Sequence, residues 1–247
     1  VRAILFRIDS PGGSALASDI VWQAVERAKE LGKPVVASFS DVAASGGYYV
    51  AAGADRIVAQ PTSYTGSIGV FVLKPVIGGL LEKLGVGVEV MTRGPHADVL
   101  LSSRTLDAAT REVLRDDIRS VYELFVARVA AGRSMTSDQV DALGQGRVWT
   151  GAQAKERGLV DVLGGLRVAA VEARKLVGLE EDAPVALVQY PKPRPLAEEL
   201  AELIGGVHVA TAPGLPLPAS LASLVDLVRH LPVGAPLLVP PGLFEIR

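Results

Sequence analysis

Ser45 is the residue best suited to act as a nucleophile. It lies in the stretch 43–48 (AASGGY), after an apolar run at 34–39 that predicts a buried strand and before a short helix predicted at 48–52. A serine at such a strand-to-helix turn presents its hydroxyl beyond the sheet, and the first helical amides, which lack intrahelical partners, point the same way. The two glycines that follow leave a substrate carbonyl free to reach those amides. The same small residues would also let a helix pack closely on a strand, and this stretch alone does not decide between the two.

Two further turns of small residues follow predicted strands. The turn at 9–14 (DSPGGS) contains Gly12 and Gly13, whose amides can stay uncovered and bind an oxyanion. The turn at 65–69 (TGSIG) contains Ser67. Ligands of open α/β sheets bind at the carboxyl ends of the strands, so the three turns could converge on one crevice, as a catalytic site requires.

Strands and helices alternate along the chain, which indicates an α/β fold. Strands are predicted at 3–8, 34–39, 56–59, 86–91 and 185–188, and further helices at 75–84 and 168–176. One further helix is predicted from an apolar face that ends at Gly32, formed by Ile20, Ala24, Ala28 and Leu31. A long helix capped by Thr105 or Asp107 is predicted from an apolar face of Leu114, Ile118, Val121, Phe125 and Val129. Two capping boxes, Thr136 with Gln139 and Thr150 with Gln153, predict two short helices.

Composition excludes several classes of function. The chain has 247 residues, of which 49% are hydrophobic, so it can bury a core as one large domain or one domain with an appendage. Its formal net charge is -2 and no basic stripe is interleaved with aromatic residues, so nucleic acid is not expected as a partner. There is no cysteine, and the three histidines are not at metal-ligand spacing, so neither a metal nor a cofactor is expected; they are His96, His208 and His230.

The two ends of the chain differ in character. Ten of the 16 prolines follow residue 190, so we expect a domain at 1–189 and a proline-rich extension at 190–247 without chemistry of its own. The chain opens inside a predicted strand, and we therefore expect it to be a fragment that lacks an upstream part. No apolar run is long enough to span a membrane, and the first residues are not a signal peptide.

Five motifs in this order resemble the signal peptide peptidase A family, also called protease IV, over roughly 1–176. They are DSPGGS at 9–14, AASGGY at 43–48, TGSIG at 65–69, GRVWTGAQA at 146–154 and GLVD at 158–161. The resemblance implies a Clp-protease/crotonase-like α/β fold of repeated ββα units, with stacked sheets and flanking helices. It also implies a serine endopeptidase that cleaves membrane-derived peptides such as signal-peptide remnants. Association with the bacterial membrane, an extracytoplasmic catalytic domain and a homo-oligomer belong to the same family picture.

The motifs of the family also imply roles for individual residues. Ser45 corresponds to the nucleophile of a Ser–Lys dyad, and Ser67 to a hydroxyl that helps to hold the lysine. The amide of Gly46, together with that of Gly12 or Gly13, corresponds to the oxyanion hole. In such a dyad, burial lowers the pKa of the lysine toward neutrality, so that its amine can take the proton of the serine.

The lysine itself is missing at the position that the resemblance assigns to it, where the chain has Ala97. In long forms of the family the first of two related halves supplies the lysine and the second supplies the serine. We favour the interpretation that this chain is such a second half, with its lysine supplied by the upstream half or a neighbouring subunit; the alternative is a natural or engineered inactivation. Lys74, Lys83 and His96 are the other candidate bases, and each is more simply interpreted as a surface residue.

Two further functional hypotheses compete with the peptidase. A non-catalytic pseudo-protease that binds peptides or scaffolds an oligomer would explain the alanine at position 97. A crotonase-like acyl-CoA enzyme shares the fold and the oxyanion hole, but it would leave Ser45 without a role, and no glutamates are suitably placed on the second turn.

Overall fold

The strand β2 (Val35–Ala44) organises the sheet. A computed structural model describes residues 1–191, and residues 1–183 form one compact unit. On one edge β2 pairs in parallel with β1, and on its other edge it pairs in parallel with β3 through its first half and with β4 through its last three residues. The outer strands are β6, parallel to β3, and β5, antiparallel to β4. The bounds are β1 (Ile4–Ser10), β3 (Arg56–Ala59), β4 (Tyr64–Gly66), β5 (Val148–Thr150) and β6 (Val162–Leu163).

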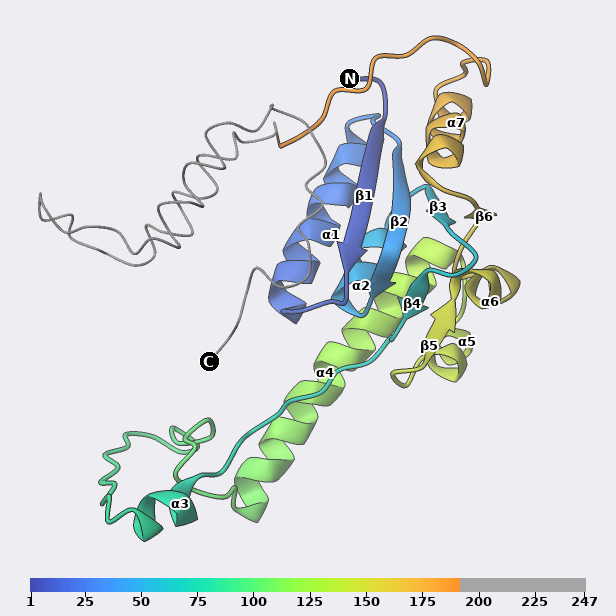
Figure 1. Cartoon of the computed structure of the whole chain (residues 1–247). Helices are drawn as coiled ribbons and strands as arrows, with labels where there is room; N and C mark the ends of the chain where they lie inside the picture. Colours follow the sequence, from blue (N-terminus) through green and yellow to red (C-terminus); the bar gives the residue numbers. More distant parts are fainter. Residues whose placement is uncertain (192–247) are drawn as a thin grey trace, which may run out of the picture. The chain divides into compact units, whose positions relative to one another are not determined.

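Helices cover both faces of this sheet (Figure 1). Helices α1 and α2 pack on one face and α4 packs on α2, around a core to which Phe39, Tyr48 and Phe125 contribute. Helix α7 covers the other face, over a smaller cluster of Val36, Val58 and Ala169. The alternation of Val36 and Ala37 toward opposite faces follows from the two-residue period of a strand. The helices are α1 (Ala15–Glu30), α2 (Gly46–Ala52), α3 (Gly78–Lys83), α4 (Ala108–Arg133), α5 (Ser137–Leu143), α6 (Gly151–Glu156) and α7 (Leu166–Leu176).

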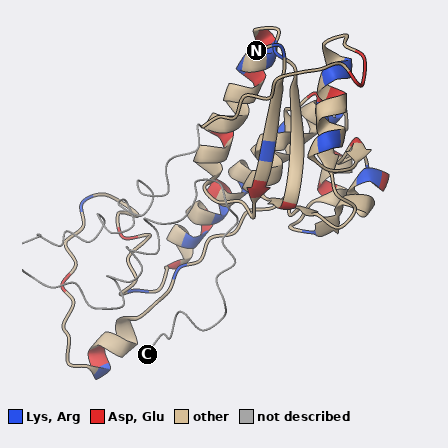
Figure 2. Cartoon of the chain, turned by 45° about the horizontal axis from the view of Figure 1, so that its top comes forward, with Lys and Arg blue, Asp and Glu red and all other residues tan. Residues whose placement is uncertain are grey.

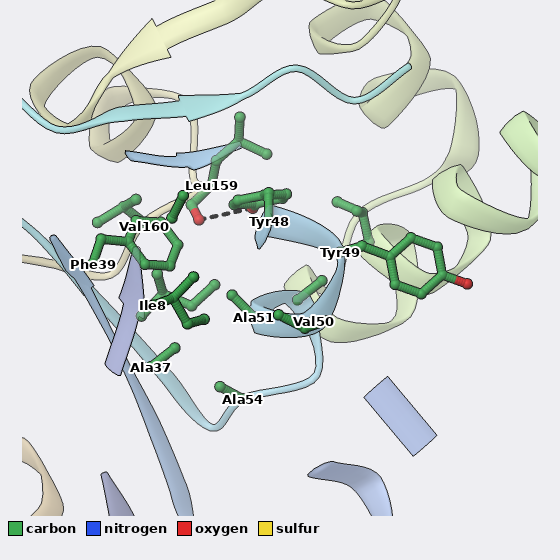
Figure 3. Packing of buried hydrophobic residues seen from close by; sticks show 14 of the residues in the cluster. Ile8, Ala37, Phe39, Tyr48, Tyr49, Val50, Ala51, Ala54, Leu159 and Val160 are labelled. Atoms are coloured by element: carbon green, nitrogen blue, oxygen red, sulfur yellow. Dashed lines mark hydrogen bonds between the residues drawn. The ribbon is translucent and has the colours of Figure 1, made fainter. Parts of the chain in front are cut away.

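The main core is fixed by one buried tyrosine and one ion pair. The ring of Tyr48 is fully buried, lies edge-on to Phe39, and its hydroxyl donates to the carbonyl of Leu159 over 2.8 Å (Figure 3). Arg133, at the end of α4, donates to both carboxylate oxygens of Asp161 over 2.6 and 3.0 Å. These contacts hold α2 and the end of α4 against the segment that leads into β6.

Charged residues of both signs are interspersed along the helices of the unit (Figure 2). Several are paired along one helix, as Arg115 is with Glu112 and Arg119 with Asp116 on α4. Such exposed pairs contribute little to stability, so the fold depends mainly on the cores described above.

Most predicted elements are confirmed with shifted ends. The strands predicted at 3–8, 34–39 and 56–59 correspond to β1, β2 and β3, and the long helix begins after Asp107, whose carboxylate accepts the amide of Thr110. Both predicted capping boxes are present, at the starts of α5 and α6. The helix predicted at 75–84 is shorter and forms α3.

Three predictions are wrong. Residues 86–91 and 185–188 form no strand, since neither segment finds a partner strand within residues 1–191 and the apolar side chains stay largely exposed. The predicted buried face of α1 is also wrong at Ile20 and Leu31, which are 59% and 72% exposed, although Ala28 packs against the core as predicted. The most buried side chains of the helix are Ser18 and Val25. The predicted extension lies outside the described residues beyond position 191.

Candidate active site

Ser45 occupies a strained turn between β2 and α2. Its backbone has φ 52° and ψ -120°, a conformation that costs free energy in a residue with a side chain. Its amide donates to the carbonyl of Gly66 over 2.8 Å, which fixes the turn against the end of β4. As the residue before α2, Ser45 makes no side-chain capping hydrogen bond. Ser45 therefore lies at the strand-to-helix turn that the sequence predicts, and its hydroxyl is not used to cap the helix.

The turn after β1 packs directly on this turn, backbone against backbone. A Cβ atom at Gly12 would lie 2.7 Å from the Cβ of Ser45, and a Cβ at Gly46 would lie 2.5 Å from the Oγ of Ser18. A Cβ at Gly47 would lie 2.6 Å from the carbonyl oxygen of Ser10. These separations are shorter than any real Cβ contact, so the two turns can meet only with glycine at positions 12 and 47, whereas at Gly46 the close atom is the end of the Ser18 side chain on α1.

Two amides near Ser45 remain available for a ligand. Within residues 1–191 the amides of Gly13 and Gly46 donate no hydrogen bond, whereas the amide of Gly12 donates to the Oγ of Ser10 over 3.2 Å. The amides of Gly13 and Gly46 lie close together, because a Cβ at Gly46 would lie 3.2 Å from the nitrogen of Gly13. The geometry thus favours Gly13 over Gly12 as the second donor beside Gly46.

A first cavity, of about 380 Å³, opens beside Ser45 and is lined mainly by apolar side chains. Four of the five residues predicted as the apolar face of the long helix form its wall on α4, while the fifth, Val129, lies in the core. Tyr49 also lines it, and the hydroxyl of Tyr49 donates to Asp19 over 2.7 Å. Burial, and then this hydrogen bond, raise the pKa of Tyr49 to about 12, so the phenol stays neutral at ordinary pH. The apolar residues of the wall are Val70, Phe71, Val72, Leu114, Ile118, Val121 and Phe125.

A second cavity, of about 710 Å³, is also lined by Ser45 and is more polar. Ser67 lines it, with φ 49° and its amide bonded to the carbonyl of Arg147 over 2.7 Å. Tyr122 and Gln145 line it as well, and the sequence did not single them out. The nearest sequence signal for Gln145 was the adjacent motif at 146–154, whereas Tyr122 belongs to a helix that was interpreted only through its apolar face.

The remaining predicted candidates do not line either cavity. Ala97, at the position assigned to the lysine, is exposed in a turn. Lys83 is exposed on α3, and the Nζ of Lys74 donates to the carbonyl of Arg104. The Nδ1 of His96 lies 2.8 Å from the Oγ1 of Thr110, near the start of α4. Among the described residues, then, no lysine or histidine lines a cavity that contains Ser45.

Residues 1–191 contain neither a membrane-spanning helix nor a cluster of metal ligands. No helix there has both the length and the apolar character to cross a bilayer. No group of three or more His, Cys, Asp or Glu side chains there is gathered as a metal ion would require.

The amino-acid sequence of the chain is similar to those of known proteins. Residues 27–180 match the protein family described as Peptidase family S49. The chain is 41% identical to the chloroplastic serine protease SPPA of Arabidopsis thaliana over 83% of its length, and 37% identical to Protease 4 of Haemophilus influenzae over 75%. It spans only 30% of the length of each of these two relatives. A putative protease of Synechocystis is 41% identical over 80% of the chain and 71% of that protein.

Proposed function

The chain belongs to peptidase family S49, and we propose that it is the nucleophile-bearing part of a serine endopeptidase in which Ser45 attacks the scissile carbonyl. The family and the protease names of the relatives support a peptidase function. The observation that carries the assignment to Ser45 is its position: a strained serine that does not cap its helix, lies beside two amides without a hydrogen bond and lines both cavities.

The proposed chemistry is acyl transfer in two steps. The Oγ of Ser45 bonds to the carbonyl carbon of the substrate while a base removes its proton, and the carbonyl oxygen becomes an oxyanion. The amides of Gly13 and Gly46 donate to that oxyanion, a contribution of roughly 3–4 kcal/mol for each well-placed donor. The intermediate collapses, the amine leaves with the proton, and water then hydrolyses the acyl-enzyme by the same steps.

We propose that the base is a lysine supplied from outside this chain, by an upstream half of the same protein or by a neighbouring subunit. This accounts for Ala97 and for the absence of a lysine from both cavities within residues 1–191. The second cavity is the proposed entry for the lysine, because Ser45 and Ser67 both line it and the hydroxyl of Ser67 can accept a hydrogen bond from the amine.

The first cavity is the proposed site for an apolar side chain of the substrate, since its wall on α4 and residues 70–72 is almost wholly hydrophobic. Peptides derived from membrane proteins, including cleaved signal peptides, fit this character. We extend the proposal to the whole protein: a Clp-protease/crotonase-like homo-oligomer associated with the bacterial membrane, whose catalytic domain faces away from the cytoplasm.

The experiment is turnover of an internally quenched apolar peptide by the complete natural protein and by its Ser45→Ala variant. Loss of the nucleophile should lower kcat by about 10⁴-fold or more, as in other serine peptidases. Equal turnover by the two proteins would show that Ser45 is not the nucleophile.

A pseudo-protease is the second candidate, favoured by the exposed Ala97 and the lack of a base at the cavities within the described residues. It predicts that the intact protein binds an apolar peptide without cleaving it, and that Ser45→Ala leaves the biological activity of the protein unchanged.

A further inference from the structure

Tyr122 links α4, α5 and the segment before β5 beside the second cavity. It is half-buried in the middle of α4, and its hydroxyl donates to the Oδ1 of Asp141 on α5 over 2.5 Å. The same hydroxyl accepts the backbone amide of Gln145 over 3.2 Å, and the Oδ2 of Asp141 accepts the side-chain amide of Gln145 over 3.2 Å. One phenol and one carboxylate therefore hold both the backbone and the side chain of Gln145.

The segment held in this way lies against Ser67. The amide of Gly146 donates to the carbonyl of Ile68 over 2.8 Å, and the amide of Ser67 donates to the carbonyl of Arg147 over 2.7 Å. The β4–β5 ladder continues past the strands into this pair of bonds, since Gly66 pairs with Val148. A displacement of residues 145–147 would therefore displace Ser67.

Residues 144–147 pack tightly against their neighbours. A Cβ at Gly69 would lie 2.9 Å from the Cα and nitrogen of Gly146, and a Cβ at Gly144 would lie 3.0 Å from the hydroxyl of Tyr122. Both Ser67 and Gln145 have positive φ, at 49° and 56°, a conformation that side-chain-bearing residues keep only when their surroundings impose it. The hydrogen bonds of Tyr122 are part of those surroundings.

The electrostatics agree with this arrangement. Burial and the hydrogen bond to Asp141 raise the pKa of Tyr122, and the hydrogen bond from Tyr122 lowers the pKa of Asp141. The phenol is thus a neutral donor and the carboxylate a charged acceptor over the pH range in which a peptidase works.

We infer that Tyr122, held by Asp141, is a positioning residue that fixes Ser67 and the adjoining wall of the second cavity for the incoming amine. The inference rests on the proposed function, because it assigns to this wall the orientation of the base beside Ser45. Tyr122 acts through Gln145 and Arg147 and takes no part in the bonds that form and break.

The test uses the complete natural protein with the quenched peptide and compares kcat and KM. Tyr122→Phe and Asp141→Ala should each lower kcat by about tenfold, the effect of one or two lost hydrogen bonds, and change KM by less than about twofold. Asp141→Asn keeps an oxygen acceptor for the phenol and should remain within about threefold of the unmodified kcat. Tyr64→Phe is the control, since Tyr64 is 58% exposed on β4 and lines neither cavity.

The melting temperature of each variant shows whether it is folded at the assay temperature. Rates are compared only among folded variants, so a loss of stability is not mistaken for a loss of positioning. Unchanged kcat in folded Tyr122→Phe, or an effect on KM alone, overturns the inference. If Tyr122→Phe does not fold, Asp141→Ala and Asp141→Asn decide: equal kcat values for the two overturn it. If the unmodified protein shows no turnover that depends on Ser45, the proposed function fails instead, and the two failures are distinguished.

Discussion

The amide of Ser45 donates a hydrogen bond to the carbonyl of Gly66 over 2.8 Å. This bond joins the serine of one small-residue turn to the residue before Ser67 in another, although the two turns are separated in the sequence by α2 and β3. The turn after β1 approaches the same serine from Gly12. The three turns that the sequence predicted could share one crevice thus meet around Ser45.

A side chain at Gly46 should damage the proposed oxyanion hole. In Gly46→Ala the new methyl group would lie 2.5 Å from the Oγ of Ser18 and 3.2 Å from the nitrogen of Gly13, so Ser18 and the amide of Gly13 have to shift. We expect kcat of the complete protein to fall by about 10²-fold, the loss that follows when one oxyanion donor is removed. Gly79→Ala, where a Cβ meets nothing within 4 Å, is the control and should leave kcat unchanged.

A second substitution tests the cause of that loss. Ser18→Ala removes the oxygen that the new methyl group would meet, so the double variant should recover part of the kcat lost in Gly46→Ala. No recovery at all would mean that the damage does not arise from the contact with Ser18.

Loss of the Ser67 hydroxyl should slow catalysis without unfolding the protein. We expect Ser67→Ala to lower kcat by about tenfold or more, because a neutral lysine amine loses one hydrogen-bond partner. Ser134→Ala is a closely matched control: Ser134 also has positive φ, at 53°, but it ends α4 and lines neither cavity. If both variants have normal kcat, Ser67 has no part in holding the base.

The ion pair between Arg133 and Asp161 should contribute more to the free energy of unfolding than the exposed ion pairs of α4. The side chains are only 8% and 23% exposed, and Asp161 also accepts the amide of Ile57 over 2.7 Å. Arg133→Met should lower the free energy of unfolding by about 3 kcal/mol, since it leaves a partly buried carboxylate without its partner. Arg115→Ala, on the exposed pair with Glu112, should cost less than about 0.5 kcal/mol. Urea denaturation measures both, and comparable losses would refute the ranking.

Alkaline pH should destabilise the fold through its buried tyrosines. Because the pKa of Tyr49 is raised from 10.0 in the unfolded chain to about 12 in the fold, its contribution is complete below pH 10 and is lost as pH rises toward 12. Burial raises the pKa of Tyr48 in the same direction. The urea midpoint should therefore fall between pH 10 and 12, and less steeply in Tyr49→Phe. An equally steep fall in that variant would show that Tyr49 does not titrate with unfolding.

Local signals in the sequence predicted the elements well, and tertiary contacts explain the errors. The capping boxes at Thr136 and Thr150 were predicted correctly, and Asp107 is the cap among the two candidates, Thr105 and Asp107, because a cap and its partner lie within three residues. The burial of Ile20 on α1 was predicted wrongly, because the close approach of Ser18 to Gly46 turns Ile20 outward.

The site shows the same division between local and tertiary information. The glycine-rich turns were visible in the sequence as motifs, and so was Ser45. The preference for Gly13 over Gly12 depends on a hydrogen bond to Ser10, and the place of Tyr122 depends on contacts with α5. Neither contact has a periodic or motif signature, so only the folded structure could reveal it.

The most direct measurement of the central claim uses a fluorophosphonate probe that reacts with activated serines. The probe is applied to the complete natural protein, to its Ser45→Ala variant and to the chain of residues 1–247 alone, and mass spectrometry locates the label. The account predicts a label on Ser45 in the complete protein and none in the variant or the isolated chain, since the lysine comes from outside it. A label on Ser45 in the isolated chain would contradict an external base, and no label on Ser45 in any of the three would contradict its role as nucleophile.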